Sequence, residues 1–167
     1  LKLQPPPLGY DLRDQSQMRQ LLEQNDMEVQ RKPVRGVWTP TLTPATSGTI
    51  TLSTALGRYV KIGQLVTCWF NCTASATSSP LGNVQLTGLP FLSENITSQF
   101  GSGSLSQWGG ITLSANFTFL APRVNINDTK ALFYESGSAQ VSAAIQGGSC
   151  SSTTILIGML NYMSASA

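Results

Sequence analysis

Residues 65–74, LVTCWFNCTA, repeat with a period of two, and this alternation constrains the fold more than any other feature of the chain. Successive side chains of a β-strand point to opposite faces of a sheet. One face of this segment would carry Val66, Cys68, Phe70 and Cys72, and the other Leu65, Thr67, Trp69, Asn71 and Thr73. The first set is the more apolar, so we expect a half-buried strand whose Val66 face belongs to a core.

The residues before this segment complete a hairpin. Residues 58–62, RYVKI, also favour a strand, and Gly63-Gln64 is a Gly-X pair that suits a two-residue type II′ turn. Further strands are predicted at residues 50–53, 83–87, 110–120, 131–135, 141–145 and 153–163. About eight strands joined by turn-rich loops favour an antiparallel β-sandwich of jelly-roll type.

Two predicted strands differ in the character of their faces. In residues 110–120, one face would be apolar and buried, formed by Ile111, Leu113, Ala115, Phe117 and Phe119. In residues 153–163 both faces are mostly apolar, which favours a strand that is covered on both sides, with another subunit as one of the covers. Residues 101–110, GSGSLSQWGG, predict a flexible loop, in which Trp108 is either a packing residue or a platform for a ligand.

The N-terminal part of the chain has a different composition. Eleven charged side chains lie in residues 1–36 and only seven in residues 37–167. Residues 11–33 are expected to form an α-helix, because Asp11 is a suitable N-cap and Pro33 cannot continue a helix. Residues 34–48 are rich in Pro, Gly, Ser and Thr and are expected to link this helix to a β-sandwich domain at 49–167.

The predicted helix carries a heptad-like seam with spacings of four, three and four residues, formed by Met18, Leu22, Asn25 and Val29. Two interpretations stay open. The helix either lies on its own domain or joins a short homotrimeric bundle that the attached domains hold together. In the bundle these four residues form the trimer interface, and Asn25 is a polar seam residue of the kind that sets register.

Residues 1–10, LKLQPPPLGY, are expected to form an extended arm. Three consecutive prolines favour polyproline II, which has no internal hydrogen bonds and needs an outside surface to hold it. Apolar side chains flank the prolines and suit pockets on a partner. We therefore expect an anchor formed by Leu1, Leu3, Pro5, Pro6, Pro7, Leu8 and Tyr10.

The composition excludes several kinds of chemistry. The chain contains no histidine, so Ser-His-Asp and Cys-His catalysis are excluded. The carboxylates beyond residue 36 are Glu94, Asp128 and Glu135, and no motif marks two of them as a catalytic pair. Scattered cysteines are a poor zinc site, and no phosphate-binding loop is present. We expect no enzymatic activity, no cofactor and no metal.

The three cysteines, Cys68, Cys72 and Cys150, do not form a full disulfide framework. The first two lie about 13 Å apart on one face of a strand and cannot bond to each other without breaking it. They are either buried free thiols, or Cys150 bridges to one of them.

Charge and hydropathy exclude two classes of partner. Beyond residue 36 only four basic side chains occur, which is too few for a nucleic-acid groove with clustered Lys and Arg. No apolar run approaches the roughly 20 residues that a membrane-spanning helix needs, so no membrane insertion is expected.

Three short motifs resemble a domain that recurs in tailed-phage virion proteins, mostly tail fibres and tailspikes. They are Trp38-Thr39-Pro40, the hairpin from Gly57 to Gly63, and Gly88-Leu89-Pro90-Phe91, and the likeness covers residues 36–91. The N-terminus resembles that of small proteins from phage structural gene clusters, through Pro5-Pro6-Pro7, Tyr10-Asp11 and Leu22-Glu23. The resemblance implies a trimeric β-domain of a virion and transfers no ligand-binding residues.

These observations lead to a hypothesis about function. The expected protein is a head decoration, or cement, protein that binds the phage major capsid protein or another virion protein through its arm. This choice depends on the lack of a long shaft segment in the sequence. The alternative is a short tail or head fibre whose β-domain binds a host surface glycan or protein. Either interpretation places the chain in the virion, on the capsid surface or the tail.

Overall fold

The computed structural model describes residues 14–166, apart from the side chains of residues 14, 15 and 26–31. The chain divides into two compact units, Leu1–Lys32 and Pro33–Ala167, which we describe separately. Because the described residues start at residue 14, the predicted anchor residues between Leu1 and Tyr10 lie outside them.

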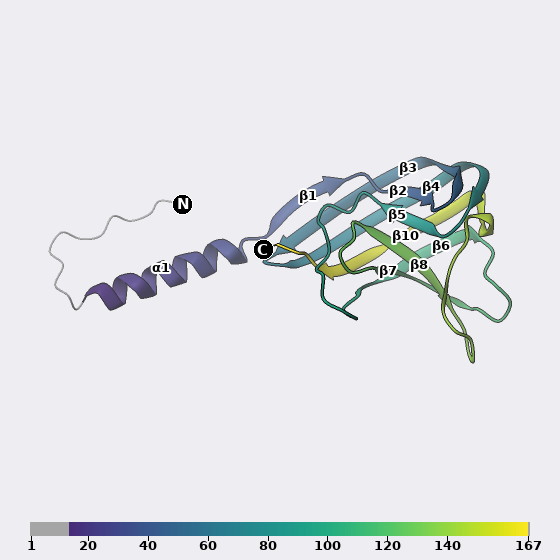
Figure 1. Cartoon of the computed structure of the whole chain (residues 1–167). Coiled ribbons are helices and arrows are strands. Elements are labelled where there is room, and N and C mark those ends of the chain that lie inside the picture. Colours follow the sequence, from purple (N-terminus) through teal and green to yellow (C-terminus); the bar gives the residue numbers. More distant parts are fainter. Residues whose placement is uncertain (1–13, 167) are drawn as a thin grey trace. The chain divides into compact units, whose positions relative to one another are not determined.

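The first unit contains one helix, α1 (Asp14–Arg31), which confirms the predicted helix over the described residues (Figure 1). On its seam, Met18 and Asn25 are half-buried while Leu22 is 60% exposed. The side chain of Val29 lies outside the described residues. No helix in residues 14–166 is long and apolar enough to cross a membrane.

The second unit is built on a single antiparallel sheet of ten strands. Its hydrogen-bonded order is β1-β3-β4-β10-β6-β7-β8-β5-β2, and β9 pairs with β8 at the side. A short 3₁₀ turn at Gly147–Ser149 precedes the last strand. The strands are β1 (Val34–Trp38), β2 (Thr41–Pro44), β3 (Ser47–Ile62), β4 (Leu65–Leu81), β5 (Val84–Thr87), β6 (Gly101–Ile111), β7 (Phe119–Val124), β8 (Lys130–Ser136), β9 (Ala143–Ala144) and β10 (Cys150–Met163).

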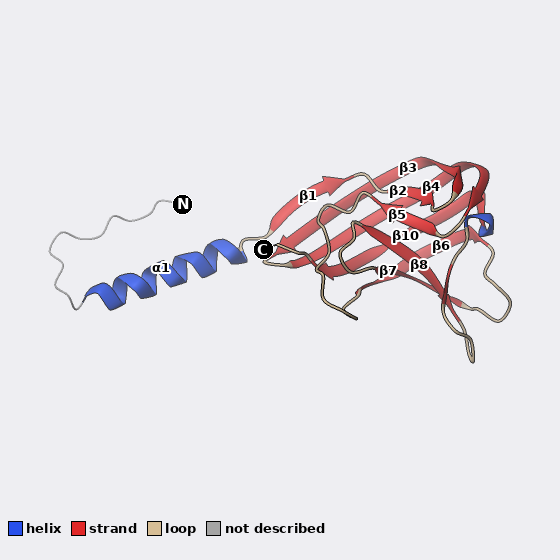
Figure 2. Ribbon diagram, viewed as in Figure 1, coloured by secondary structure: helices blue, strands red, loops and turns tan. Residues whose placement is uncertain are grey.

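The sheet curls into a half-barrel, as Figure 2 shows. Strands β1 and β2 are consecutive in the chain yet lie at opposite ends of the strand order, and β2 also contacts β3 and β4. The two ends of the sheet must therefore approach each other. This arrangement confirms the predicted mainly β, antiparallel, sandwich-like fold with one α-helix. The strand order does not by itself confirm a jelly roll.

The core lies between the two halves of the curled sheet. Phe70 of β4 meets Phe133 of β8 edge to face, with ring centroids 6.2 Å apart. Fully buried side chains from β5, β7 and β10 surround this pair, including Leu86, Leu120 and Leu156. Burial of these apolar side chains against one another is what stabilises the curled sheet.

The predicted hairpin is confirmed and is longer than predicted. Strands β3 and β4 pair from Ile62 and Leu65 outward, and the turn has a positive φ of 58° at Gly63, as a type II′ turn requires. The Val66 face, with Cys68, Phe70 and Cys72, is buried, and the opposite face is half-buried or exposed. The strands continue well beyond residues 58 and 74 because they stay paired with each other, with Ser47 opposite Leu81 at the far end.

Residues 34–48 do not form a plain linker. They contain β1 and β2, which pair with β3 and β5 respectively. Both partner strands are distant in sequence, so local composition, with Pro40 and Pro44 among many small polar residues, gave no sign of this pairing. The sheet thus begins at Val34, directly after Pro33.

Residues 101–110 were predicted as a flexible loop, and this prediction was wrong, because they form most of β6. The glycines here serve close approach between strands. A Cβ added at Gly103 would clash with the carbonyl oxygen of Met159, and one at Gly101 would lie 2.6 Å from the Cβ of Tyr162. The glycines of this segment therefore allow the backbone of β6 to lie close to β10.

The prediction of one strand over residues 110–120 was also wrong. Strand β6 ends at Ile111, and residues 112–118 form a connection with a positive φ of 68° at Asn116. Strand β7 then starts at Phe119, which is 58% exposed, whereas Leu120 is buried. Glu135 holds the connection: its carboxylate accepts hydrogen bonds from the Ser114 amide at 2.8 Å and the Ser114 hydroxyl at 2.6 Å.

Candidate functional site

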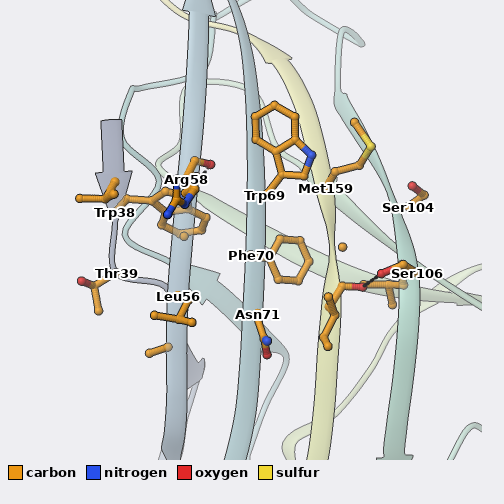
Figure 3. A pocket seen from close by; sticks show the side chains of 16 residues that line it. Trp38, Thr39, Leu56, Arg58, Trp69, Phe70, Asn71, Ser104, Ser106 and Met159 are labelled. Atoms are coloured by element: carbon orange, nitrogen blue, oxygen red, sulfur yellow. Dashed lines mark hydrogen bonds between the residues drawn. The ribbon is translucent and has the colours of Figure 1, made fainter. Parts of the chain in front are cut away.

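A row of side chains crosses five strands on the side of the sheet that faces away from the core, which we call the outer face. Val37 of β1 pairs with Arg58 of β3, and Arg58 pairs with Trp69 of β4. Trp69 pairs in turn with Met159 of β10, and Met159 with Ser104 of β6. Because paired residues of an antiparallel sheet point to the same side, these side chains form one continuous row (Figure 3).

A groove with a volume of about 640 Å³ lies over this row. Leu56, Asn71 and Ile157 form the neighbouring row and also line the groove. Val37, Leu56 and Trp69 are 77%, 64% and 44% exposed. A contiguous exposed apolar patch marks a binding surface on a soluble protein. The groove is therefore the candidate functional site.

Two close contacts hold the sheet beneath the groove. A Cβ added at Gly57 would lie 2.5 Å from Nε1 of the buried Trp38, so only glycine leaves room for the indole. The same Nε1 donates a hydrogen bond of 3.3 Å to the carbonyl oxygen of Arg58. A Cβ at Gly36 would likewise meet the ring of Tyr59 at 2.5 Å. These motif residues position β1 against β3.

The remaining motif residues also pack on the core side of the hairpin. The rings of Tyr59 and Phe91 meet edge to face, with centroids 5.2 Å apart. The ammonium group of Lys61, which is almost fully buried, lies 5.3 Å from the centroid of the Phe91 ring. The Tyr162 hydroxyl donates a hydrogen bond of 3.0 Å to the Phe91 carbonyl. The motifs thus build a scaffold. Arg58, Val60 and Ile62 of the hairpin motif point to the outer face, and Arg58 lines the groove.

The groove offers apolar contact and one positive charge. Among the described residues, Arg58 is the only charged one that lines it, and none of the lining residues carries a carboxylate or a thiol. The Ser106 hydroxyl donates a hydrogen bond of 3.2 Å to the Ile157 carbonyl (Figure 3). The Asn71 side chain accepts one of 3.5 Å from the Thr73 hydroxyl. Such a set suits packing and stacking, and it lacks the acid and base of a hydrolytic site.

The cysteines are free and buried, which confirms the first of the two alternatives for them. Burial raises the pKa of the Cys68 thiol to about 12 and that of the Cys72 thiol to about 12. It also raises the pKa of Cys150 above its usual value. A thiol with a raised pKa is a poor nucleophile at neutral pH, so these residues act as small core side chains.

The described carboxylates do not converge on the groove. Glu135 is buried and engaged with Ser114. The Asp128 carboxylate accepts a hydrogen bond of 2.8 Å from the amide of Thr129. Within residues 14–166, no three His, Cys, Asp or Glu side chains are placed to hold a metal ion.

The structure brings together residues that the sequence alone did not combine. The predicted anchor residues lie outside the described part of the chain, and the predicted seam is a separate feature of α1. The groove was missed, although the sequence placed Trp69 on the face away from the core and showed that both faces of residues 153–163 are mostly apolar. Their adjacency depends on β10 pairing with β4, across more than 80 residues of sequence, which no local pattern indicates.

Trp108 lies on β6 opposite Leu156 and is partly exposed, so both of its predicted roles stay open.

Comparison with known proteins gives one informative match. No protein-family model and no curated protein matches the chain. The chain is similar to the crystal structure of the Dettilon tailspike protein (gp208), with a TM-score of 0.67 and 26% sequence identity. The match covers 78% of this chain and 24% of the tailspike chain. The chain thus spans about a quarter of the length of the tailspike that it resembles.

Proposed function

We propose that this chain is a structural protein of a phage tail, and that its second unit is a β-domain of a tail fibre or tailspike. The observation that carries this proposal is the similarity to a tailspike protein over most of the chain, in both fold and sequence. The motifs that first suggested a tail fibre are scaffold residues of this fold, which agrees with their recurrence in such proteins.

The similarity favours the tail over the capsid surface. Head decoration was the expected role, but the solved structure that the chain resembles is a tailspike protein. Nothing in the comparison supports a cement role. The proposed role of the described residues is structural and not enzymatic, because the groove provides one cation and no acid–base pair.

Antibody labelling of intact virions tests this location. Gold-labelled antibodies against the β-unit, viewed by electron microscopy, are expected to mark the tail or its tip. Antibodies against the major capsid protein serve as the matched control and should mark the head. Even labelling of the head by the first antibody would contradict the tail assignment and restore the cement hypothesis.

We extend the proposal to a homotrimer in which α1 contributes a seam. Met18 and Asn25 are half-buried, while Leu22 is well exposed in the single chain and is available to other copies. A helix of this length is too short to associate strongly alone, so contacts between β-units must contribute. Light scattering of the purified protein should give three times the chain mass of 17.8 kDa. A monomer at micromolar concentration would refute the trimer.

Residues 1–10 keep their proposed role as the anchor to another virion protein. A variant that starts at Asp11 should still fold, because the helix and sheet are intact, and should fail to bind particles stripped of this protein. Co-sedimentation with such particles measures this. Equal sedimentation of the full-length and shortened proteins would place the anchor elsewhere. Binding of a host glycan or protein by the β-unit stays a prediction.

A further inference from the structure

We propose that the outer face over strands β7 and β8 carries a binding site for a phosphate group, in which Arg123 and Lys130 are the two cations. Neither residue lines the groove. This inference goes beyond the proposed function and depends neither on the tail location nor on the homotrimer.

The two cations lie on neighbouring strands and point to the same side of the sheet. Val124 of β7 pairs with Ala131 of β8, and both are fully buried. Arg123 and Lys130 are the residues directly before them, so both point away from the core. They lie diagonally across the strand pair, where Cα atoms are about 7–8 Å apart and long side chains can reach a common ligand.

The Arg123 guanidinium is held by residues on both sides of β7. Its Cζ atom lies 4.3 Å from the centroid of the Phe100 ring, which directly precedes β6, and 3.9 Å from that of the Tyr134 ring of β8. Its Nη2 atom donates a hydrogen bond to the Tyr134 hydroxyl and one of 3.5 Å to the side-chain oxygen of Asn125. These contacts orient the guanidinium and leave its charge uncompensated.

Two of the three guanidinium nitrogens lack an acceptor. The Nε atom of Arg123 is buried and has no hydrogen-bond partner. The Nη1 atom makes no hydrogen bond with the described residues either, but solvent reaches it. A buried donor without an acceptor is unfavourable, and in a native structure it calls for a partner such as a bound ion. An anion at Nη1 offsets this cost through its charge, even while Nε stays covered.

The free polar groups beside Arg123 are donors. The side-chain oxygen of Asn125 accepts from Arg123, so its free group is the amide NH₂. The Tyr134 hydroxyl also accepts from Arg123, so its proton is free to be donated. The Lys130 ammonium has no partner among the described residues. Two cations and several donors match a phosphate group, which carries about two negative charges and several acceptor oxygens, better than a singly charged carboxylate.

The described carboxylates do not neutralise this cluster. Glu135 is engaged with the 112–118 connection, and the Asp128 carboxylate accepts a hydrogen bond from the next amide in the chain. Glu94 lines a separate small pocket. Within residues 14–166, no carboxylate forms an ion pair with Arg123 or Lys130. The positive charge of the cluster therefore stays available to attract an anion.

Calorimetric titration of the full chain with inorganic phosphate tests this site, at constant ionic strength with chloride as the competing anion. We expect saturable binding of one phosphate by each chain. Arg123→Gln and Lys130→Gln should each weaken this binding at least about tenfold, because each removes a charged donor. Arg35→Gln is the matched control and should bind like the wild type, because it removes the same charge from an exposed arginine of β1 outside the cluster.

The Lys130→Gln variant keeps the test decisive if Arg123→Gln disturbs the packing of the two rings. Circular dichroism should show that Lys130→Gln and Arg35→Gln are folded. Phosphate binding that is absent in the wild type, or unchanged in the Lys130→Gln variant, would overturn the proposal. An equal loss in the Arg35→Gln variant would also overturn it, because the attraction would then come from net charge alone.

Further titrations distinguish the possible ligands. Acetate that binds as tightly as phosphate at the same ionic strength would overturn the assignment of the site to phosphate. A hexose phosphate that binds more tightly than inorganic phosphate would support the proposal and identify a phosphorylated saccharide as the source of the group. Equal binding of the hexose phosphate and inorganic phosphate would support a site that recognises the phosphate group alone.

Discussion

The two faces of strand β4 have the same backbone and different roles. On the core face, Cys68, Phe70 and Cys72 are buried and meet the opposite half of the curled sheet. On the outer face, Trp69 and Asn71 line the groove. Neighbouring residues in the sequence therefore face the core and the groove in turn. Period-two alternation thus separates the residues of β4 that pack in the core from the residues that lie exposed on the outer face.

The largest effect is expected on the core face. Phe70→Ala removes a buried ring that packs edge to face against Phe133, so it should lower the free energy of unfolding by about 3–5 kcal/mol. Urea unfolding followed by fluorescence measures this. Phe117, which the sequence placed on a buried strand face, lies half-buried in the 112–118 connection, so Phe117→Ala should cost clearly less. Equal losses would mean that the connection belongs to the core.

The next effect concerns the glycines of β6, the strand that forms the far rim of the groove. A Cβ at Gly103 would clash with the backbone of β10, while one at Gly109 meets nothing within 4 Å. Gly103→Ala should therefore cost about 1–3 kcal/mol through overpacking, and Gly109→Ala less than about 0.5 kcal/mol. The difference in melting temperature between these two variants checks the pairing of β6 with β10. If Gly109→Ala proved the more damaging, the register of β6 would be in error.

This region also shows why part of the fold could be predicted and part could not. The β3–β4 hairpin was predictable because its signals are local: alternation around Phe70 and a Gly-X turn at Gly63. Strand β6 was not, because its glycines look like a loop until β10 lies beside them. The 110–120 segment alternates like a strand, yet the Ser114–Glu135 hydrogen bonds favour a connection there. The groove depends on such distant pairings throughout.

The buried thiols predict a loss of stability at alkaline pH. The pKa values of Cys68 and Cys72 are raised to about 12, so both thiols keep their protons in the folded chain above pH 9.0, where they ionise in the unfolded chain. The unfolded state then binds fewer protons than the folded state, so stability falls as pH rises through this window. Each thiol contributes a slope of about 1.4 kcal/mol per pH unit.

Substitution of one thiol isolates this contribution. The Cys72→Ala variant should show a shallower decline between pH 9 and 11 than the wild type in urea unfolding under reducing conditions. A matched slope in both proteins would show that Cys72 is accessible to solvent in the folded state. That result would weaken the contrast between the two faces of β4, because the core face would then admit water.

A smaller effect is expected at Thr67 on the outer face. The sequence placed Thr67 on the face opposite the core. In the structure Thr67 is half-buried, and its hydroxyl donates a hydrogen bond of 2.7 Å to the Asn161 side chain on β10. Thr67→Ala should cost about 0.5–1.5 kcal/mol for this bond. A double-mutant cycle with Asn161→Ala measures the coupling directly. Additive losses would show that the bond contributes nothing.

The smallest effect on the subunit fold is expected at Trp69, next to Phe70 in sequence and opposite to it in space. Trp69 is nearly half exposed in the single chain, so Trp69→Ala should cost the isolated subunit about 1 kcal/mol or less. Urea unfolding followed by circular dichroism measures this. If Trp69→Ala destabilised the monomer as much as Phe70→Ala does, both faces of β4 would be core, and the groove would be part of the fold instead of a surface for a partner.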